Sequence, residues 1–227
     1  MDSHDGWRTR PMYSIPRAAR LVGMPSITIR RWLYGMEKDQ ASMRPVFGTL
    51  AKAKELSAEV SFIQLAEIAV ARHFRNRRIK LERVRRAHEF ARAHFQLQYP
   101  FAEMDFKVVA VSILTEFQQE EPGPSLLMSV DPVGQLALPL DVAEELDHFE
   151  YIDALAARWY PLGQSALVVI DPQVGAGLPT VSGRRIPVDT IYGRWKAGEN
   201  IGFIASDFKL KGAEVETVLR YAEKLAA

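Results

Sequence analysis

SIPRAARLVGMPSITIRRWLYG, residues 14–35, decides how the N-terminal part of the chain folds. Ser14 can cap a helix, Pro16 suits the first turn of that helix, and Gly23 can end it in a left-handed conformation. The apolar residues on one face of this helix are Ile15, Ala18, Ala19 and Val22. These signals predict a short amphipathic helix that stops at Gly23.

A second short helix is expected directly after it. Met24 and Pro25 do not continue the first helix, Ser26 offers a new N-cap, and Gly35 closes the second helix. The apolar anchors expected for the second helix are Ile27, Ile29, Trp32 and Leu33. Two short helices around a tight turn predict a helix-turn-helix.

The outward positions of the second helix are expected to be Thr28, Arg30 and Arg31, with no acidic residue among them. Such side chains suit phosphate contact or the reading of guanine if the helix lies in a major groove of DNA. An ordinary helical hairpin with a solvated basic face would explain the same residues.

Composition limits the classes of protein that fit. At 227 residues, with 48% hydrophobic and 25% charged residues, the chain can bury one or two cores. No run reaches the roughly 18 apolar residues of a membrane helix, and residues 1–10 lack the apolar core of a signal peptide. We therefore expect a cytoplasmic protein. With no cysteine, disulfides, thiol nucleophiles and thiolate metal sites are excluded.

The net charge of +1 hides two halves of opposite sign. Residues 1–100 hold 19 Lys and Arg against 9 Asp and Glu, a net charge of +10, and residues 101–227 hold 10 against 19, a net charge of −9. A basic half with a helix-turn-helix indicates nucleic acid, whereas phosphate would repel the acidic half. The two halves are expected to meet different partners.

Residues 36–57 predict a small hairpin or irregular wing beside the second helix. A basic wing would contact the neighbouring DNA backbone, although a charged surface loop explains these residues equally well. The candidate DNA-binding residues of the two helices and the wing are Ser26, Thr28, Arg30, Arg31, Arg44, Lys52 and Lys54.

Residues 61–95 predict two further helices, with a cap at Ser61 and a break near residues 76–79. Nine Lys and Arg against two Glu lie between Arg72 and Arg92, which fits either phosphate contact or a solvated face. The helix-turn-helix, the wing and a helix pair ending in FARAHF together resemble the DNA-binding domain of MerR-type regulators, over about residues 13–96. MerR-type proteins usually continue into a long dimerising helix, whereas Tyr99 and Pro100 end the helical pattern here.

From Phe106 the apolar period changes to two, with strand-like runs at 107–117, 126–130 and 135–138. A small antiparallel sheet is expected there, followed by a short helix that Asp141 caps. A hairpin of residues 149–152 with 157–160 is expected next. Glu144, Glu145, Asp147, Glu150 and Asp153 are interpreted as a solvated acidic surface rather than a catalytic pair.

The C-terminal region predicts a short strand at 167–170 and three helices at 188–197, 201–208 and 213–225, arranged as a second helix-turn-helix. Glu214 and Glu216 would place negative charge where DNA phosphates should lie, so we expect that it does not read DNA. The expected fold class is therefore α+β: a flexible lead (1–12), a winged helix-turn-helix domain (13–100), a small antiparallel sheet (101–163) and a three-helix domain (164–227).

Four short motifs in residues 167–222 closely resemble the domain-of-unknown-function 433 family found in VapB-like antitoxins. They are VVIDP at 168–172, GxP at 177–179, GxRIPV at 183–188 and WKAGE at 195–199. The resemblance implies a toxin partner of the PIN-like ribonuclease class, whose active site is a cluster of metal-binding carboxylates.

Arg184 and Arg185 are the only adjacent basic pair in the acidic half, and Pro187 keeps Ile186 extended. A guanidinium there could bind toxin carboxylates bidentately. The competing interpretation, an internal salt bridge from Arg185 to Asp171 or Asp189 that fixes the turn, is slightly favoured by the sequence.

The sequence contains no serine elbow, metal-ligand spacing or glycine-rich cofactor loop, which argues against an enzyme, a metal site and a cofactor. We expect an antitoxin that neutralises a PIN-like ribonuclease toxin, binds operator DNA as a homodimer and represses its own operon. The alternative is a MerR-type transcriptional regulator without a toxin partner, whose acidic half senses a ligand.

Overall fold

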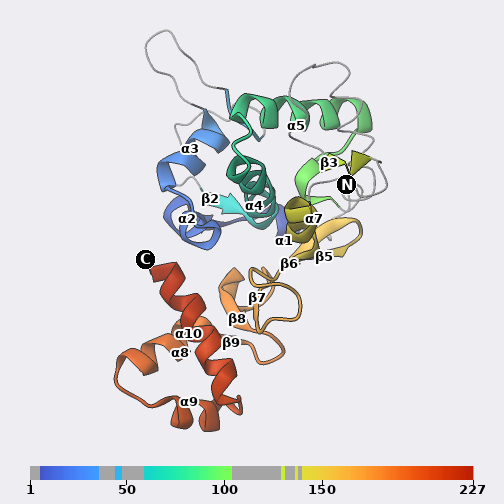
Figure 1. Ribbon diagram of the computed structural model, residues 1–227. Coiled ribbons are helices and arrows are strands. Elements are labelled where there is room, and N and C mark those ends of the chain that lie inside the picture. Colours follow the sequence, from blue (N-terminus) through green and yellow to red (C-terminus); the bar gives the residue numbers. More distant parts are fainter. Residues whose placement is uncertain are drawn as a thin grey trace. The chain divides into compact units, whose positions relative to one another are not determined.

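The computed structural model describes residues 6–35, 44–47, 59–103, 129–130, 136–137 and 140–226, which form two compact units (Figure 1). The helix-turn-helix unit comprises Thr9–Asp147 and Tyr151–Ala156. The C-terminal unit comprises Met1–Arg8, His148–Glu150 and Ala157–Ala227. The N-terminal stretch that we expected to be a flexible lead holds, in its described part, helix α1 (Gly6–Thr9) and the start of a strand.

The helix-turn-helix unit is mostly helical, with two small antiparallel strand pairs, β1 with β2 and β3 with β4. Figure 1 shows α2 and α3 side by side. The described elements are β1 (Pro11–Ser14), α2 (Ile15–Val22), α3 (Ser26–Tyr34), β2 (Glu59–Ser61), α4 (Phe62–Asn76), α5 (Leu81–Phe95), the 3-10 helix η1 (Pro100–Ala102), β3 (Ser129–Val130), β4 (Leu136–Ala137) and α7 (Leu140–Asp147).

The caps of α2 confirm the sequence prediction, and those of α3 correct it in part. Ser14 Oγ accepts a hydrogen bond from the Arg17 N–H at 3.4 Å, and Gly23 at φ 67° donates its N–H to the last turn of α2. Ser26 is not the N-cap of α3: Pro25 is, and its carbonyl accepts hydrogen bonds from the N–H groups of Thr28 and Ile29. The fixed φ of proline already gives the extended backbone that a cap needs.

The structure corrects the expected burial of two side chains, one on α3 and one in the acidic region. Ile29 is fully buried, but Ile27, expected to be an anchor, is 52% exposed. The two residues lie about 200° apart around a helix, so only one of them can face the core. Glu145 was expected to be solvated, yet it is buried and pairs with His73 Nε2 at 2.8 Å.

Helices α4 and α5 form the centre of the unit. Ser61 and Gln64 make a reciprocal capping box at the start of α4, and the predicted break between the two helices is confirmed. Glu67 on α4 and His88 on α5 are both buried and lie 2.7 Å apart. The His88 ring also contacts Phe101 edge-on, with ring centroids 5.1 Å apart, so the buried pair has apolar surroundings.

The expected central sheet can be assessed only in part, because most of the runs 107–117, 126–130 and 135–138 lie outside the described residues. Their described parts, β3 and β4, pair antiparallel, with Ser129 opposite Ala137. Helix α7 begins at Leu140, so Asp141 lies inside the helix rather than at the cap.

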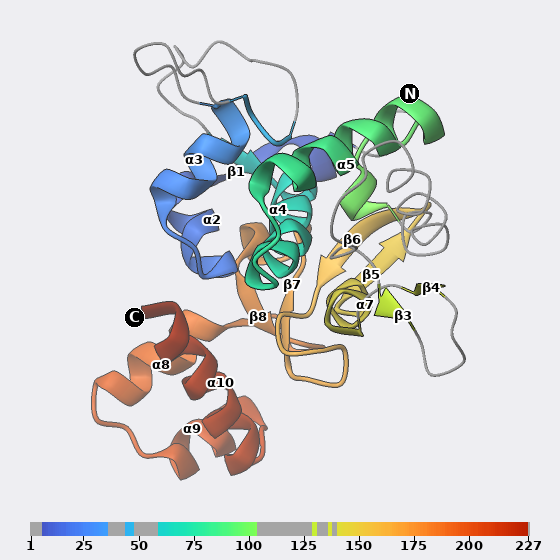
Figure 2. The ribbon, with the colours of Figure 1, turned by 45° about the horizontal axis from the view of Figure 1, so that its top comes forward.

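The C-terminal unit combines strands with helices, as Figure 2 shows. Strands β7, β8 and β9 lie wholly in this unit, with residues 149–150 of β5 and 157–159 of β6. They belong to a sheet of order β5-β6-β7-β8-β9, in which β6 to β9 pair antiparallel with their neighbours. The elements are β5 (Phe149–Ile152), β6 (Leu155–Trp159), β7 (Val168–Ile170), the 3-10 helix η2 (Gly175–Gly177), β8 (Pro179–Val181), β9 (Ile186–Pro187), α8 (Val188–Lys196), α9 (Ile201–Phe208) and α10 (Gly212–Ala226). Strand β6 begins two residues earlier than the predicted 157–160.

The core of the C-terminal unit lies between α8, α9, α10 and the sheet. Val168 and Val181 contribute from β7 and β8, and Ile191, Ile204 and Val218 contribute one buried side chain from each helix. The N-cap predicted for α9 is confirmed, because Asn200 Oδ1 accepts a hydrogen bond from the Phe203 N–H at 2.9 Å. The three helices therefore begin and end close to the positions that the sequence predicts.

Candidate nucleic-acid interface and polar pocket

Helix α3 presents two exposed arginines, Arg30 and Arg31, to solvent. Within the described part of the chain, neither guanidinium forms an ion pair or a hydrogen bond, so both charges are available to a ligand. Tyr34 lies one turn further along the same side, and partial burial raises the pKa of its hydroxyl, while the charge of Arg30 opposes that shift. The charge on this side of α3 comes from the two adjacent arginines in the middle of the helix.

The other residues predicted to bind DNA differ in how exposed their side chains are. Ser26 at the start of α3 and Arg44 are exposed, whereas Thr28 is half-buried. Thr28 therefore does not share the open face of Arg30. Lys52 and Lys54 lie outside the described residues, as does most of the predicted wing.

Helix α3 is held from behind by the segment Arg44–Phe47. The Trp32 carbonyl accepts a hydrogen bond from the Val46 N–H at 2.7 Å, and the Phe47 ring meets the Trp32 ring edge-on at 6.1 Å. Arg85 on α5 donates from Nε to the Pro45 carbonyl at 3.0 Å, which fixes the segment to the helix pair. The backbone after the exposed arginines is thus positioned by the core.

The turn between α2 and α3 is held by Arg72 of α4. Its guanidinium donates to the Val22 carbonyl at the end of α2, and its nitrogens lie 3.3 Å from where a side chain on Gly23 would begin. A residue other than glycine would be strained at this positive φ and crowded by the guanidinium. Sequence reasoning did not give Arg72 this role, although an arginine within the apolar stripe of α4 was a usable signal.

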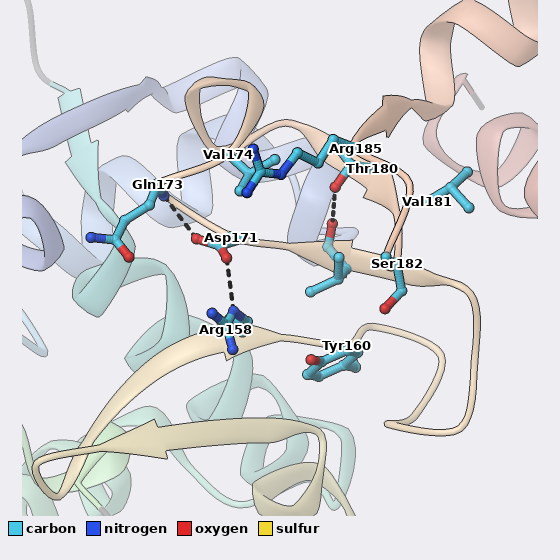
Figure 3. Close-up of a pocket in the computed structure, with 11 residues that line it drawn as sticks. Arg158, Tyr160, Asp171, Gln173, Val174, Thr180, Val181, Ser182 and Arg185 are labelled. Carbon is cyan, nitrogen blue, oxygen red and sulfur yellow. Dashed lines mark hydrogen bonds and ion pairs between the residues drawn. The ribbon is translucent and has the colours of Figure 1, made fainter.

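A polar pocket of about 500 Å³ lies in the C-terminal unit, between β6, β7, β8 and the turn that follows β8 (Figure 3). The buried carboxylate of Asp171 accepts hydrogen bonds from Arg158 Nε at 2.7 Å and from the Gln173 N–H at 2.8 Å. A second nitrogen of Arg158 pairs with Glu150. The hydrogen bonds to these two carboxylates raise the pKa of Arg158 above its ordinary value.

Arg184 and Arg185 lie in the four-residue turn Ser182–Arg185 between β8 and β9, and both are exposed. Figure 3 shows Arg185 at the rim of the pocket, with its guanidinium toward Val174. Among the described residues, the alternative salt bridge from Arg185 to Asp171 or Asp189 is not formed, and the Asp171 carboxylate pairs with Arg158. Over the described residues, no ion pair is recorded for Arg184 or Arg185. Arg185 has φ 56°, a left-handed backbone conformation that residues other than glycine adopt at a cost in free energy.

The basic side chains of the C-terminal helices differ in whether a carboxylate pairs with them. Arg194 on α8 binds both oxygens of Glu199, with Nε 2.9 Å from each, and also pairs with Asp207 on α9. These hydrogen bonds raise the pKa of Arg194 and lower that of Glu199. Lys209 and Lys211 are exposed beyond α9.

Among the residues that the structure describes, no group of three or more His, Asp or Glu side chains is placed to hold a metal ion. No helix in the described ranges is long and apolar enough to cross a membrane.

Two family models match parts of the chain. Residues 11–88 match the model described as "Putative DNA-binding HTH domain", and residues 168–222 match "Protein of unknown function (DUF433)". The first match covers α2 and α3 with the helices behind them. The second covers most of the polar pocket and helices α8 to α10.

Two proteins of Mycobacterium tuberculosis strain H37Rv are similar over most of the chain. "Uncharacterized protein Rv2308" is 25% identical over 227 residues, covering 95% of this chain and 91% of its own length. "Putative antitoxin VapB45" is 25% identical over 211 residues, covering 87% and 88%. The crystal structure of Rv2018 from Mycobacterium tuberculosis superimposes with a TM-score of 0.75 at 21% identity, over 92% of this chain and 98% of that one, which shows a shared fold.

Proposed function

We propose that this chain is the antitoxin of a toxin–antitoxin pair, and that it binds DNA through α3. The observation that carries DNA binding is the pair of exposed arginines on the second helix of a helix-turn-helix, for which no described residue is a hydrogen-bond or ion-pair partner. The match to a DNA-binding helix-turn-helix model supports this assignment. The similarity to a protein named as an antitoxin supports the antitoxin role.

In this proposal α3 enters the major groove, where Arg30 and Arg31 contact phosphates or guanine. Ser26 at the helix N-terminus and Arg44 contact the DNA backbone, as do Lys52 and Lys54 of the predicted wing. Thr28 has a smaller part, because it is half-buried. Two copies of the chain bind an inverted repeat, with recognition helices about one DNA turn apart, roughly 34 Å.

Toxin neutralisation is assigned to the C-terminal unit. Arg184 and Arg185 supply two exposed guanidinium groups, whereas Arg158 and Arg194 of the same unit are paired with carboxylates. A PIN-like ribonuclease holds its metal ions with a cluster of carboxylates, and a guanidinium binds carboxylates bidentately. The arginine pair would occupy that acidic cluster and exclude metal or RNA. Repression of the antitoxin's own operon would follow from DNA binding by the same chain.

A tagged full-length chain purified from its native host tests the partner. We expect a small nuclease in stoichiometric amount, and a chain recovered alone would contradict the antitoxin role. Replacement of Arg184 and Arg185 by alanine should then leave folding and DNA affinity unchanged but impair protection against the co-expressed nuclease. Lys209→Ala with Lys211→Ala is the matched control, since it removes two exposed cations from another surface of the same unit.

The polar pocket favours a second candidate function. A cavity of about 500 Å³ with an unpaired arginine at its rim could hold a small acidic ligand, as in a MerR-type transcriptional regulator without a toxin partner. Under that alternative the purified chain carries no nuclease, and its DNA affinity changes with a small anion. Under the antitoxin proposal the nuclease is present, and replacement of Arg185 reduces protection against the co-expressed nuclease.

A further inference from the structure

Ile27 is the exposed apolar residue of α3, with 52% of its surface open to solvent. On a helix, residues three and four positions apart share a side, so Ile27 lies on the same face as Arg30 and Arg31. Ile29, Trp32 and Leu33 are buried and anchor the opposite face. The open face of α3 is therefore one isoleucine followed, a turn later, by two arginines.

The position of Ile27 within the helix matters for what it can touch. It is the second residue of α3, and in a helix-turn-helix the N-terminal residues of the second helix contact the edges of the bases. The major groove offers one apolar group, the 5-methyl group of thymine, and apolar side chains read it by contact. We propose that Ile27 recognises the 5-methyl group of a thymine beside the contacts of Arg30 and Arg31. This inference rests on the proposed binding of DNA by α3.

Charge complementarity favours DNA over an apolar protein surface as the occupant of this face. An apolar partner that covered Ile27 would also take Arg30 and Arg31 out of water, which is costly unless each cation gains an anion. In the major groove the methyl group lies between phosphates and guanine acceptors, so the apolar contact and both cations are satisfied together.

The test begins with selection of binding sites for the full-length wild-type chain from a pool of random duplex DNA. Each thymine of the selected site is then replaced singly by deoxyuridine, which removes only the methyl group, and affinity is measured by fluorescence anisotropy at fixed salt. We expect that replacing one thymine in each half-site weakens binding about four-fold. This factor corresponds to the burial of one methyl group, at about 0.8 kcal/mol.

The variant Ile27→Ala should bind the thymine and deoxyuridine sites with equal affinity, so that its sensitivity to the methyl group disappears. Ile152→Ala is the matched control, because Ile152 is also an exposed isoleucine, at 41%, on strand β5. It should keep the four-fold difference. Both variants should stay folded with a similar, small loss of thermal stability, since about half of each residue's surface is already open to solvent.

The outcomes separate this inference from the proposal beneath it. If the wild-type chain selects no sequence and binds no duplex, DNA binding by α3 is itself contradicted. If it selects a site but Ile27→Ala retains the sensitivity to the methyl group, the thymine contact is overturned while DNA binding stands. A change in oligomeric state of Ile27→Ala, measured by light scattering, would overturn it in favour of a protein contact at Ile27.

Discussion

The helix pair α2–α3 and the helix pair α8–α9 are similar in length and capping but differ in what their arginines do. In α3, Arg30 and Arg31 are exposed and make no side-chain ion pair within the described structure. In α8, Arg194 is bound by Glu199 and Asp207 from the same unit. A helix-turn-helix pattern in a sequence therefore does not by itself identify a DNA-binding surface. The two arginines of α3 remain available to phosphate, whereas Arg194 is already neutralised by carboxylates of its own unit.

The largest expected effect comes from reversing charge in each region separately. Arg30→Glu with Arg31→Glu should weaken DNA binding by at least about 100-fold, because each arginine contact is worth about 1–3 kcal/mol and the new carboxylates repel phosphate. Lys209→Glu with Lys211→Glu should change affinity little. Both pairs are exposed, so both variants should fold. A gel-shift assay in which the lysine pair had the stronger effect would show that the C-terminal helices bind DNA instead.

The ends of the helices in both pairs could largely be predicted from the sequence, because neighbouring residues determine where a helix begins and ends. Gly23, Gly35 and the caps at Ser14 and Asn200 all follow from local preferences for backbone angles and side-chain hydrogen bonds. The three C-terminal helices were predicted to within about one residue at most ends. The sequence was sufficient to predict helix ends and caps, because the residues that form them are close together in the chain.

The features that sequence did not predict depend on residues far apart in the chain. Glu145 looked solvated until the structure placed it against His73, 72 positions earlier. The Arg158–Asp171 pair likewise requires the pairing of β6 with β7. Ile27 is different, because the angular spacing of Ile27 and Ile29 already excluded burial of both, and the sequence interpretation did not use it.

Arg72→Ala tests how the exposed arginines of α3 are held in place. It removes a charged hydrogen-bond donor from the Val22 carbonyl, so the free energy of unfolding of the helix-turn-helix unit should fall by about 1.5–3 kcal/mol. DNA affinity at low temperature should fall less than on charge reversal at α3. Arg92→Ala, which removes an exposed arginine from α5, should leave thermal stability unchanged. Equal melting of both variants would show that Arg72 does not hold the turn.

Arg194→Met tests the other side of the comparison. Because Arg194 is neutralised within its own unit and also lies over the Phe208 ring, its loss should loosen α8 and α9 without changing DNA affinity. Hydrogen exchange followed by mass spectrometry should show faster exchange in peptides of α8 and α9 and unchanged exchange in α2 and α3. A loss of DNA affinity with no change in exchange would place Arg194 at a binding surface.

The smallest expected effect is a pH dependence of the same cluster. The hydrogen bonds and charge of Arg194 lower the pKa of Glu199 below its ordinary value of 4.5, although partial desolvation opposes the shift. A carboxylate whose pKa is depressed in the folded state adds stability that is complete above its unfolded pKa and is lost as the pH falls through the folded value. Glu199→Gln should therefore speed hydrogen exchange in α8 at neutral pH, with a difference from the wild type that shrinks once the pH drops below about 4. Glu216→Gln is the matched control, since Glu216 is exposed on α10 and makes no side-chain ion pair in the described structure, and it should show no such difference at any pH. A difference for Glu199→Gln that persisted unchanged into acid would mean that its effect does not come from the ionised pair with Arg194.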